Sequence, residues 1–258
     1  MPTRIGWTRQ QMLVALYLYC RIPFGKMHSR NPEIIRCSQL IDRTPSALAM
    51  KLTNIASLDP AITSTGRRGL ENVSTADKAM WEEMQADWGR FAVETQRTAS
   101  ALGIAAQLEP TIDELGMSDE VLDYTGGSKA AQATIRIGQA FFRRAVLSAY
   151  DYRCCITGLA IPMLLVASHI VPWRVDAKNR LNPRNGLCLS VLHDRSFDAG
   201  VITISENMTV SVSKRYANSG GFFETAISIY DGQPIVLPEK FRPDPGFLSY
   251  HRQHVFQR

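Results

Sequence analysis

The 258-residue sequence has few cysteines and no long apolar run. Its five cysteines are an odd number at irregular spacing, which does not indicate the disulfide framework of a small secreted domain. No apolar run approaches the ~20 residues that a membrane helix needs. The opening MPTRIGWTRQQM is not followed by the apolar core of a signal peptide. We therefore expect a cytoplasmic protein with no membrane partner.

Internal repeats and low-complexity tracts are also lacking, so the distribution of charge is the next guide. The formal net charge is +5, and bases outnumber acids over both residues 1–100 and residues 126–258. Residues 101–125 contain no Lys or Arg, but six acids: Glu109, Asp113, Glu114, Asp119, Glu120 and Asp123. Two basic regions fit binding to a polyanion such as DNA. They fit a solvated surface with a mild basic bias equally well.

Residues 1–104 are predicted to form a helical domain. Apolar residues recur at helical spacing over residues 7–20, 31–41 and from residue 45 onward. Each of these segments is preceded or opened by a residue that caps helices well, namely Thr8, Asn31 and Thr44. Asn31 and Thr44 are each followed by a proline. This proline would occupy the first position of the helix, where proline is well tolerated.

The second and third of these helices, joined by a short turn, have the outline of a helix-turn-helix. Arg43, Ser46 and Lys51 fall near the polar side of the third helix, so they are the predicted DNA contacts of this domain. An ordinary small helical bundle has the same pattern. The outline alone does not decide between the two.

A further helix is predicted at about residues 75–95, with Met80, Met84 and Trp88 on one face as core residues. The acidic stretch 105–128, which ends in YTGGSK, is predicted to be a linker. After it, residues 129–258 combine a helix ending near Tyr150 with short strands and a β-rich tail. The predicted fold class is therefore α+β, with domains at 1–104 and 129–258.

The chemistry-bearing residues lie in the C-terminal half. LLVASHIVPWR predicts a strand that ends at His169, followed by a proline. Asn185 follows in a turn, and His193 follows at the start of a helix. The order is thus His, Asn, His in a strand–strand–helix context.

This pattern resembles the HNH (ββα-metal) nuclease motif. The closest resemblance is to a subclass found in bacterial restriction endonucleases. Its pattern is C-x-x-T-G, A-x-H-I-x-P-W, N-x-x-N-G-L and H-x-x-F-D-x-G. The matching segments are residues 154–158, 167–173, 182–187 and 193–200. The resemblance implies a ββα-metal fold and a metal-dependent endonuclease acting on double-stranded DNA, with Mg²⁺ or Mn²⁺ as the cofactor.

The resemblance also implies roles for the three motif residues. His169 is the expected general base, because an imidazole titrates near neutrality and can accept a proton from water. His193 is the expected metal ligand. Asn185 is expected to tie the loop together with its amide, which both donates and accepts hydrogen bonds, or to ligate the metal as in some family members.

The sequence departs from the family at Ser168. Many members have an acidic residue or a histidine there, which supplies a second metal ligand. Asp198 is one candidate for this role, although it equally suits a capping position, and Asp194 is another. The cysteines lack the paired C-x-x-C spacing of a structural zinc site, so none is expected.

Two arginines precede the motif on a predicted helix. Arg136 and Arg143 are seven residues apart and so share a helix face. A guanidinium matches phosphate geometry, so both are predicted DNA contacts. An ion pair with a carboxylate of the protein itself is the alternative.

The leading hypothesis is a restriction-type defence endonuclease, acting on modified or unmodified DNA. The N-terminal segment resembles one that accompanies this HNH subclass, which assigns it substrate recognition. One alternative is a low-specificity effector nuclease gated by a ligand. Another is a non-catalytic DNA-binding protein with a decayed HNH fold. Because cutting two strands usually needs two sites, a homodimer is also an expectation.

Overall fold

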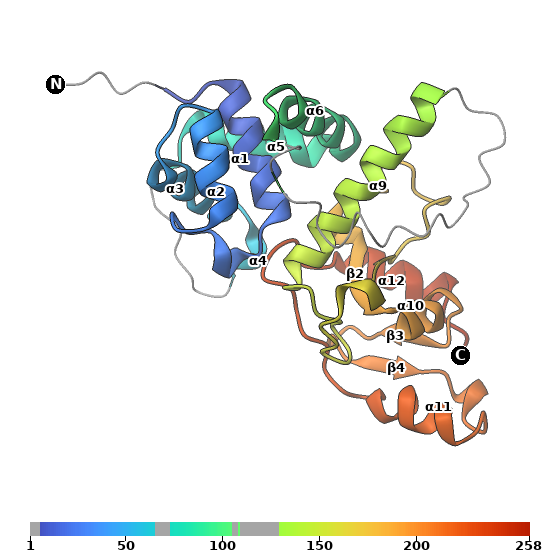
Figure 1. Cartoon of the computed structure of the whole chain (residues 1–258). Coiled ribbons are helices and arrows are strands. Elements are labelled where there is room, and N and C mark those ends of the chain that lie inside the picture. The colour runs from blue at the N-terminus through green and yellow to red at the C-terminus, as the bar shows by residue number, and fades with distance from the viewer. Residues whose placement is uncertain (1–5, 65–72, 105–107, 109–128) are drawn as a thin grey trace. The chain divides into compact units, whose positions relative to one another are not determined.

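The computed structural model describes residues 6–64, 73–104, 108 and 129–258 (Figure 1). The chain divides into two compact units, Met1–Arg144 and Ala145–Arg258. It is rich in helices and has two small antiparallel sheets, which is consistent with the predicted α+β class. The predicted linker at 105–128 lies outside the described residues, apart from Leu108.

The N-terminal unit begins with three capped helices, as predicted. They are α1 (Arg9–Arg21), α2 (Pro32–Leu40) and α3 (Pro45–Ala56). The side chains of Thr8, Asn31 and Thr44 each accept a hydrogen bond from a backbone N–H in the first turn, which stabilises these helix starts. Helix α3 packs against both α1 and α2. Two short elements complete this part of the chain, η1 (Phe24–Lys26) and α4 (Pro60–Thr63).

The single helix predicted at 75–95 is two helices, α5 (Thr75–Ala86) and α6 (Trp88–Ala101). The break lies at Asp87, whose backbone leaves the helical region at φ −150° and ψ 87°. Its carboxylate accepts a hydrogen bond from Arg90 N at 2.9 Å and so caps α6. The predicted core face is confirmed, because Met80, Met84 and Trp88 are all buried.

Helix α9 (Lys129–Ala149) contains the boundary between the two units. Sequence analysis starts the second domain at residue 129, whereas the N-terminal unit extends to Arg144. The reason is packing, because Phe141 contacts the rings of Trp88 and Phe91. Arg144 also donates a hydrogen bond to Gln96 Oε1 at 3.1 Å.

The C-terminal unit is built on a ββα arrangement. Strand β1 (Leu165–His169) pairs antiparallel with β2 (Gly186–Ser190), and α10 (Val191–Asp198) packs against both strands. His169 lies opposite Gly186 in this register. The strand ending at His169 and the helix containing His193 are therefore confirmed.

A second hairpin supports this motif. It consists of β3 (Ile202–Ile204) and β4 (Val210–Val212), with α12 (Pro245–His254) packed on β3. Gly200, at φ +69°, begins this part of the chain, and a Cβ there would lie 2.1 Å from Val255 O. Only glycine fits such a close approach. The remaining short elements are η2 (Pro162–Leu164), η3 (Pro183–Asn185), η4 (Lys214–Tyr216), α11 (Gly221–Ala226) and η5 (Ser228–Tyr230).

Candidate active site

His169 ends β1 as a half-buried side chain with a fixed ring. Its Nε2 lies 2.9 Å from the backbone oxygen of Arg180. A carbonyl oxygen only accepts hydrogen bonds, so Nε2 is the nitrogen that bears the hydrogen. In the neutral ring, Nδ1 is then the nitrogen that can accept a proton. Burial lowers the pKa of His169 to about 4, against the smaller opposite effect of the Arg180 carbonyl.

Asn185 is buried and locks the loop that follows β1. Its Oδ1 accepts a hydrogen bond from Val171 N at 2.8 Å, and its Nδ2 donates to Val171 O at 3.2 Å. Nδ2 also lies 3.4 Å from Asn179 O. The amide therefore ties both branches of the loop to the start of β2. These contacts are those of the loop-locking role, and they engage the oxygen that a metal would need.

His193 lies in the first turn of α10 and is 3% exposed. Its Nδ1 is 2.8 Å from the hydroxyl of Ser190, which also caps the helix. Its Nε2 is buried and has no hydrogen-bond partner among the described residues. Burial lowers the pKa of His193 and so favours the neutral ring. The nearby backbone of Ala226 partly offsets this lowering of the pKa. It does not form a hydrogen bond of good geometry with Nε2.

Ser168 is buried beside His169 and faces a carboxylate. Its hydroxyl has no hydrogen-bond partner of good geometry, yet it lies close enough to Asp194 to favour the charged form of that side chain. Burial and the charge of Asp198 have larger, opposite effects and raise the pKa of Asp194 to about 6. The carboxylate that faces position 168 is thus Asp194, while Asp198 lies one helical turn further and is exposed.

The His and Asp side chains of this region are candidates for a divalent-ion site. Within the described ranges, no three His, Cys, Asp or Glu side chains lie together as a complete ligand set. Mg²⁺, however, is commonly held by one or two protein ligands together with water and substrate phosphate. The neutral His193 ring, fixed through Nδ1 and unpartnered at Nε2, has the form of such a ligand. The buried carboxylate of Asp194 belongs to the same helix and lies near Ser168, so His193 and Asp194 are the residues that could hold a sparsely ligated ion.

The ββα geometry agrees with the comparison with known protein families. Residues 154–205 match the HNH endonuclease family model. The matched segment includes His169, Asn185 and His193, and it spans β1, β2, α10 and β3. It supports an HNH nuclease domain that acts on DNA, and the HNH prediction is confirmed at this level. None of the curated proteins compared with the chain matches it.

Two of the three predicted DNA contacts of the N-terminal unit, Lys51 and Arg43, have partners within the unit. Lys51 lies in the interior rather than on a polar helix face, because its ammonium group is 2.7 Å and 2.9 Å from the two carboxylate oxygens of Asp77. Arg43 donates to Gly6 O and to Gln11 Oε1, and its guanidinium lies 4.8 Å from the centre of the Trp7 ring. Ser46 is exposed on α3.

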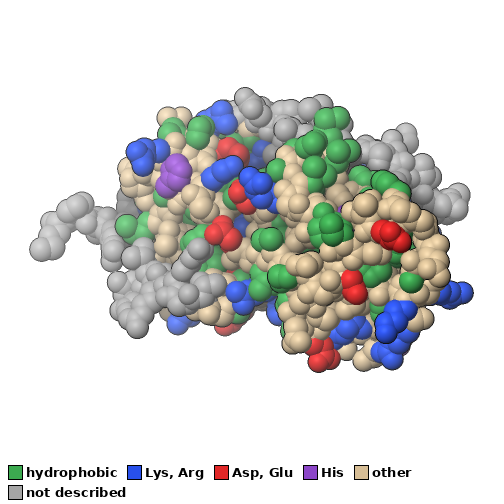
Figure 2. Space-filling view, turned by 90° about the horizontal axis from the view of Figure 1, so that it is seen from below, with side chains coloured by type: hydrophobic (Ala, Val, Ile, Leu, Met, Phe, Trp, Pro, Cys, Tyr) green, Lys and Arg blue, Asp and Glu red, His purple; other side chains and the backbone are tan. Residues whose placement is uncertain are grey.

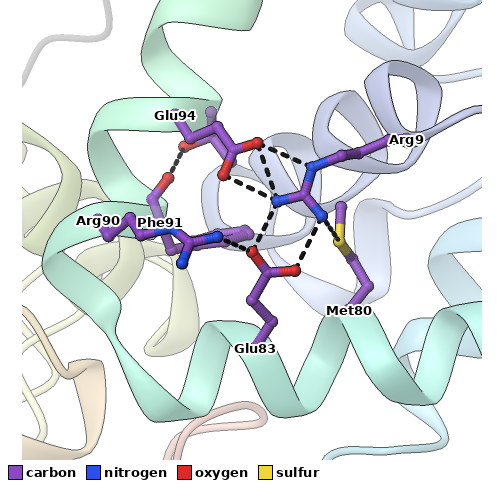
Figure 3. Close-up of polar contacts among 7 residues, drawn as sticks. Arg9, Met80, Glu83, Arg90, Phe91 and Glu94 are labelled. Atoms are coloured by element: carbon purple, nitrogen blue, oxygen red, sulfur yellow. Dashed lines mark hydrogen bonds and ion pairs between the residues drawn. The ribbon is translucent and has the colours of Figure 1, made fainter.

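A second charged cluster in this unit lies at its surface and links residues of three helices. Arg9 forms paired hydrogen bonds with Glu83 of α5 and with Glu94 of α6, at 2.7–2.9 Å (Figure 3). Arg90 binds the same Glu83 carboxylate. The hydrogen bond from Arg9 is the main cause of the lowered pKa of Glu83. The cluster joins α1 to α5 and α6, so ion pairs within the unit account for Arg9 and Arg90.

Arg136 and Arg143 lie on α9, the first exposed and the second half-buried. On the face drawn in Figure 2, Lys and Arg side chains occur singly or in small groups among apolar and other side chains. No helix among those described is both long and apolar enough to cross a membrane. Neither the family match nor this single chain supports a homodimer.

Three residues of the site were not identified from the sequence. Ser190 orients His193, and the S-x-x-H spacing at a helix start is a signal that sequence analysis overlooked. Trp173 was noted only as part of the motif, although its ring meets that of His169 edge-on at 5.5 Å. Arg180 acts through its backbone oxygen, which leaves no signal in the sequence.

Proposed function

We propose that the chain is a divalent-metal-dependent HNH endonuclease of restriction type that hydrolyses phosphodiester bonds in double-stranded DNA. The observation behind this proposal is the arrangement of His169, Asn185 and His193 on a ββα motif within the matched segment. The restriction role rests on the resemblance of the motif and the N-terminal segment to that subclass.

His169 is the proposed general base. Its Nε2 donates to the Arg180 carbonyl, so Nδ1 takes the proton from the attacking water. The lowered pKa keeps the ring neutral at pH 7, as a proton acceptor must be. Asn185 keeps the loop in place, and the loop in turn fixes the ring through Arg180.

His193 and a carboxylate of α10 are the proposed ion-holding residues. His193 would contribute Nε2, because Nδ1 is already bound to the Ser190 hydroxyl. Asp194 is buried beside Ser168 and is favoured over the exposed Asp198, while the amide of Asn185 is committed to the loop. When bound, a divalent ion stabilises the negative charge that develops on the phosphate and the leaving oxygen.

DNA recognition by the N-terminal unit is part of the proposal. The exposed Ser46 on α3 and Arg136 on α9 remain candidate contacts. Lys51 is a weaker candidate than Ser46 or Arg136, because Asp77 neutralises its charge inside the unit.

Cleavage of a DNA panel tests the proposal. The purified chain is incubated with methylated and unmethylated duplexes in Mg²⁺ or Mn²⁺, with EDTA as the metal-free control. Metal-dependent cleavage to discrete fragments is expected, and the ends of the fragments identify the sequence or modification recognised. A smear of products would favour a low-specificity effector nuclease. Absence of cleavage, together with no Mn²⁺ binding by calorimetry in the presence of DNA, would favour a decayed fold.

A further inference from the structure

The loop between β1 and β2 returns to the base at Arg180. The chain leaves β1 at His169, and eleven residues later the backbone oxygen of Arg180 lies 2.9 Å from the His169 ring. Asn185 ties this loop at Val171 and Asn179. The contact with Asn179 is long, at 3.4 Å. Asn179 is also held by Asp176, and the far branch of the loop has one more support besides these.

The side chain of Arg180 provides that support. Its Nε donates a hydrogen bond to the backbone oxygen of Trp173 at 2.8 Å. Its guanidinium carbon lies 5.2 Å from the centre of the Trp173 ring, which is the range of a cation–π contact. The two ends of the loop segment 173–180 are thereby joined by both a hydrogen bond and a stacking contact.

Trp173 is also in contact with the ring of His169, the proposed base. Its ring meets the His169 ring at a centroid distance of 5.5 Å and an angle of 84°, an edge-to-face contact. Each pair among His169, Trp173 and Arg180 is therefore in direct contact. An imidazole held by one hydrogen bond and one ring contact cannot rotate without breaking both.

The consequence concerns which ring nitrogen bears the hydrogen. The neutral imidazole has two tautomers, and the hydrogen bond made by one nitrogen decides which is present. The Arg180 carbonyl accepts only, and so it selects the form with hydrogen on Nε2 and an acceptor at Nδ1. If the carbonyl moves away, both tautomers become populated and part of the molecules lose the acceptor at the reacting position.

We propose that Arg180 and Trp173 form a clamp that holds His169 in the tautomer protonated at Nε2. Arg180 is thus a positioning residue for the general base. This role rests on the proposed nuclease function, but the clamp itself is a property of the free protein. Binding of Arg180 to a DNA phosphate is less favoured, because its Nε and the face of its guanidinium are already occupied by Trp173.

The test is a ¹⁵N NMR measurement of the His169 ring in the full-length protein without DNA. Long-range ¹H–¹⁵N spectra distinguish the two tautomers, and a His169→Gln spectrum identifies the signals. The wild type should show the Nε2–H form alone. Arg180→Met keeps the aliphatic stem but removes the guanidinium, and it should give a mixture of tautomers. Trp173→Leu, which leaves the backbone oxygen in place, should give a smaller shift in the same direction.

Arg174→Met is the matched control, since Arg174 is exposed on the same loop. It should leave the tautomer unchanged. In cleavage assays, Arg180→Met should lower kcat in proportion to the fraction of molecules in the wrong tautomer, with little change in KM. A pure Nε2–H signal in both folded variants, Arg180→Met and Trp173→Leu, would overturn the clamp. Failure of the wild type to cut DNA would overturn the nuclease function without affecting the NMR result.

Discussion

Lys51 in the N-terminal unit and His193 in the C-terminal unit are both buried polar side chains, yet their surroundings differ. Lys51 is bound by both oxygens of Asp77, so its charge is neutralised inside the unit. His193 has one ring nitrogen fixed by Ser190, and the other has no partner among the described residues. The first arrangement stabilises a fold, whereas the second leaves a ligand atom available.

The same contrast extends to the neighbours of these residues. Arg9 and Arg43 of the N-terminal unit are bound to carboxylates, an amide and a carbonyl of that unit. Ser168 of the C-terminal unit, beside the base, is buried with an unpartnered hydroxyl. A charged residue on a predicted polar helix face is thus weak support for DNA contact. Buried polar atoms without a partner among the described residues occur in both units, so those of Ser168 and His193 indicate a site only together with the motif that contains them.

Breaking the Lys51–Asp77 pair should have the largest effect on folding. Lys51→Met leaves the carboxylate of Asp77 buried and uncompensated, which should lower the free energy of unfolding by roughly 3–5 kcal/mol. Denaturant unfolding measures this loss, with Lys26→Met as the exposed control. The cleavage rate per folded molecule should not change. A loss of DNA affinity at full stability would show that Lys51 contacts DNA after all.

Removing the loop lock should affect both stability and cleavage. Asn185→Ala leaves the N–H and C=O groups of Val171 without their partners, and each buried unpaired group costs about 1–3 kcal/mol. We expect a loss of roughly 2–4 kcal/mol and cleavage reduced by more than tenfold. Asn218→Ala, an exposed asparagine of the same unit, is the control. Unchanged cleavage by a folded Asn185→Ala protein would contradict the link between loop and base.

The smallest expected effect is a dependence of stability on pH through His251. This buried ring is stacked on Phe197, and burial lowers its pKa from 6.5 to about 4. Between these pH values the unfolded chain binds more protons than the folded one. The contribution of His251 to the free energy of unfolding is therefore fully present above pH 6.5 and is lost as the pH falls toward 4. The loss should be roughly 3 kcal/mol at pH 4. Thermal unfolding from pH 7 to pH 4 measures it, and a His251→Gln protein with the same slope would refute this origin.

Local signals in the sequence predicted several helices and β1, whereas the tail predicted to be β-rich has only the short strands β3 and β4, followed by η4, α11, η5 and α12. A capping residue followed by proline marks α2 and α3, and an apolar run marks β1. The break between α5 and α6 was missed, because apolar spacing continues across Asp87 while its carboxylate caps a new helix. A pattern of side chains does not show where the backbone turns.

The candidate site was predicted only as far as side-chain identity allows. His169, Asn185 and His193 stand at recognisable spacing, and the structure places them on the ββα motif. The contact of His169 with the Arg180 oxygen was not predictable, because every residue type has a backbone carbonyl. The burial of Lys51 was equally hidden, since its partner Asp77 lies 26 residues away.

The most direct test of the central claim is chemical rescue of His169→Gly. General-base catalysis contributes about 10²–10⁴-fold. The variant should therefore cut DNA at least ~100-fold more slowly than the wild type, and added imidazole should restore part of the rate. His254→Ala, an exposed histidine of the same unit, should cut at the wild-type rate. A folded His169→Gly protein that cuts as fast as the wild type would contradict the assignment of His169 as the base.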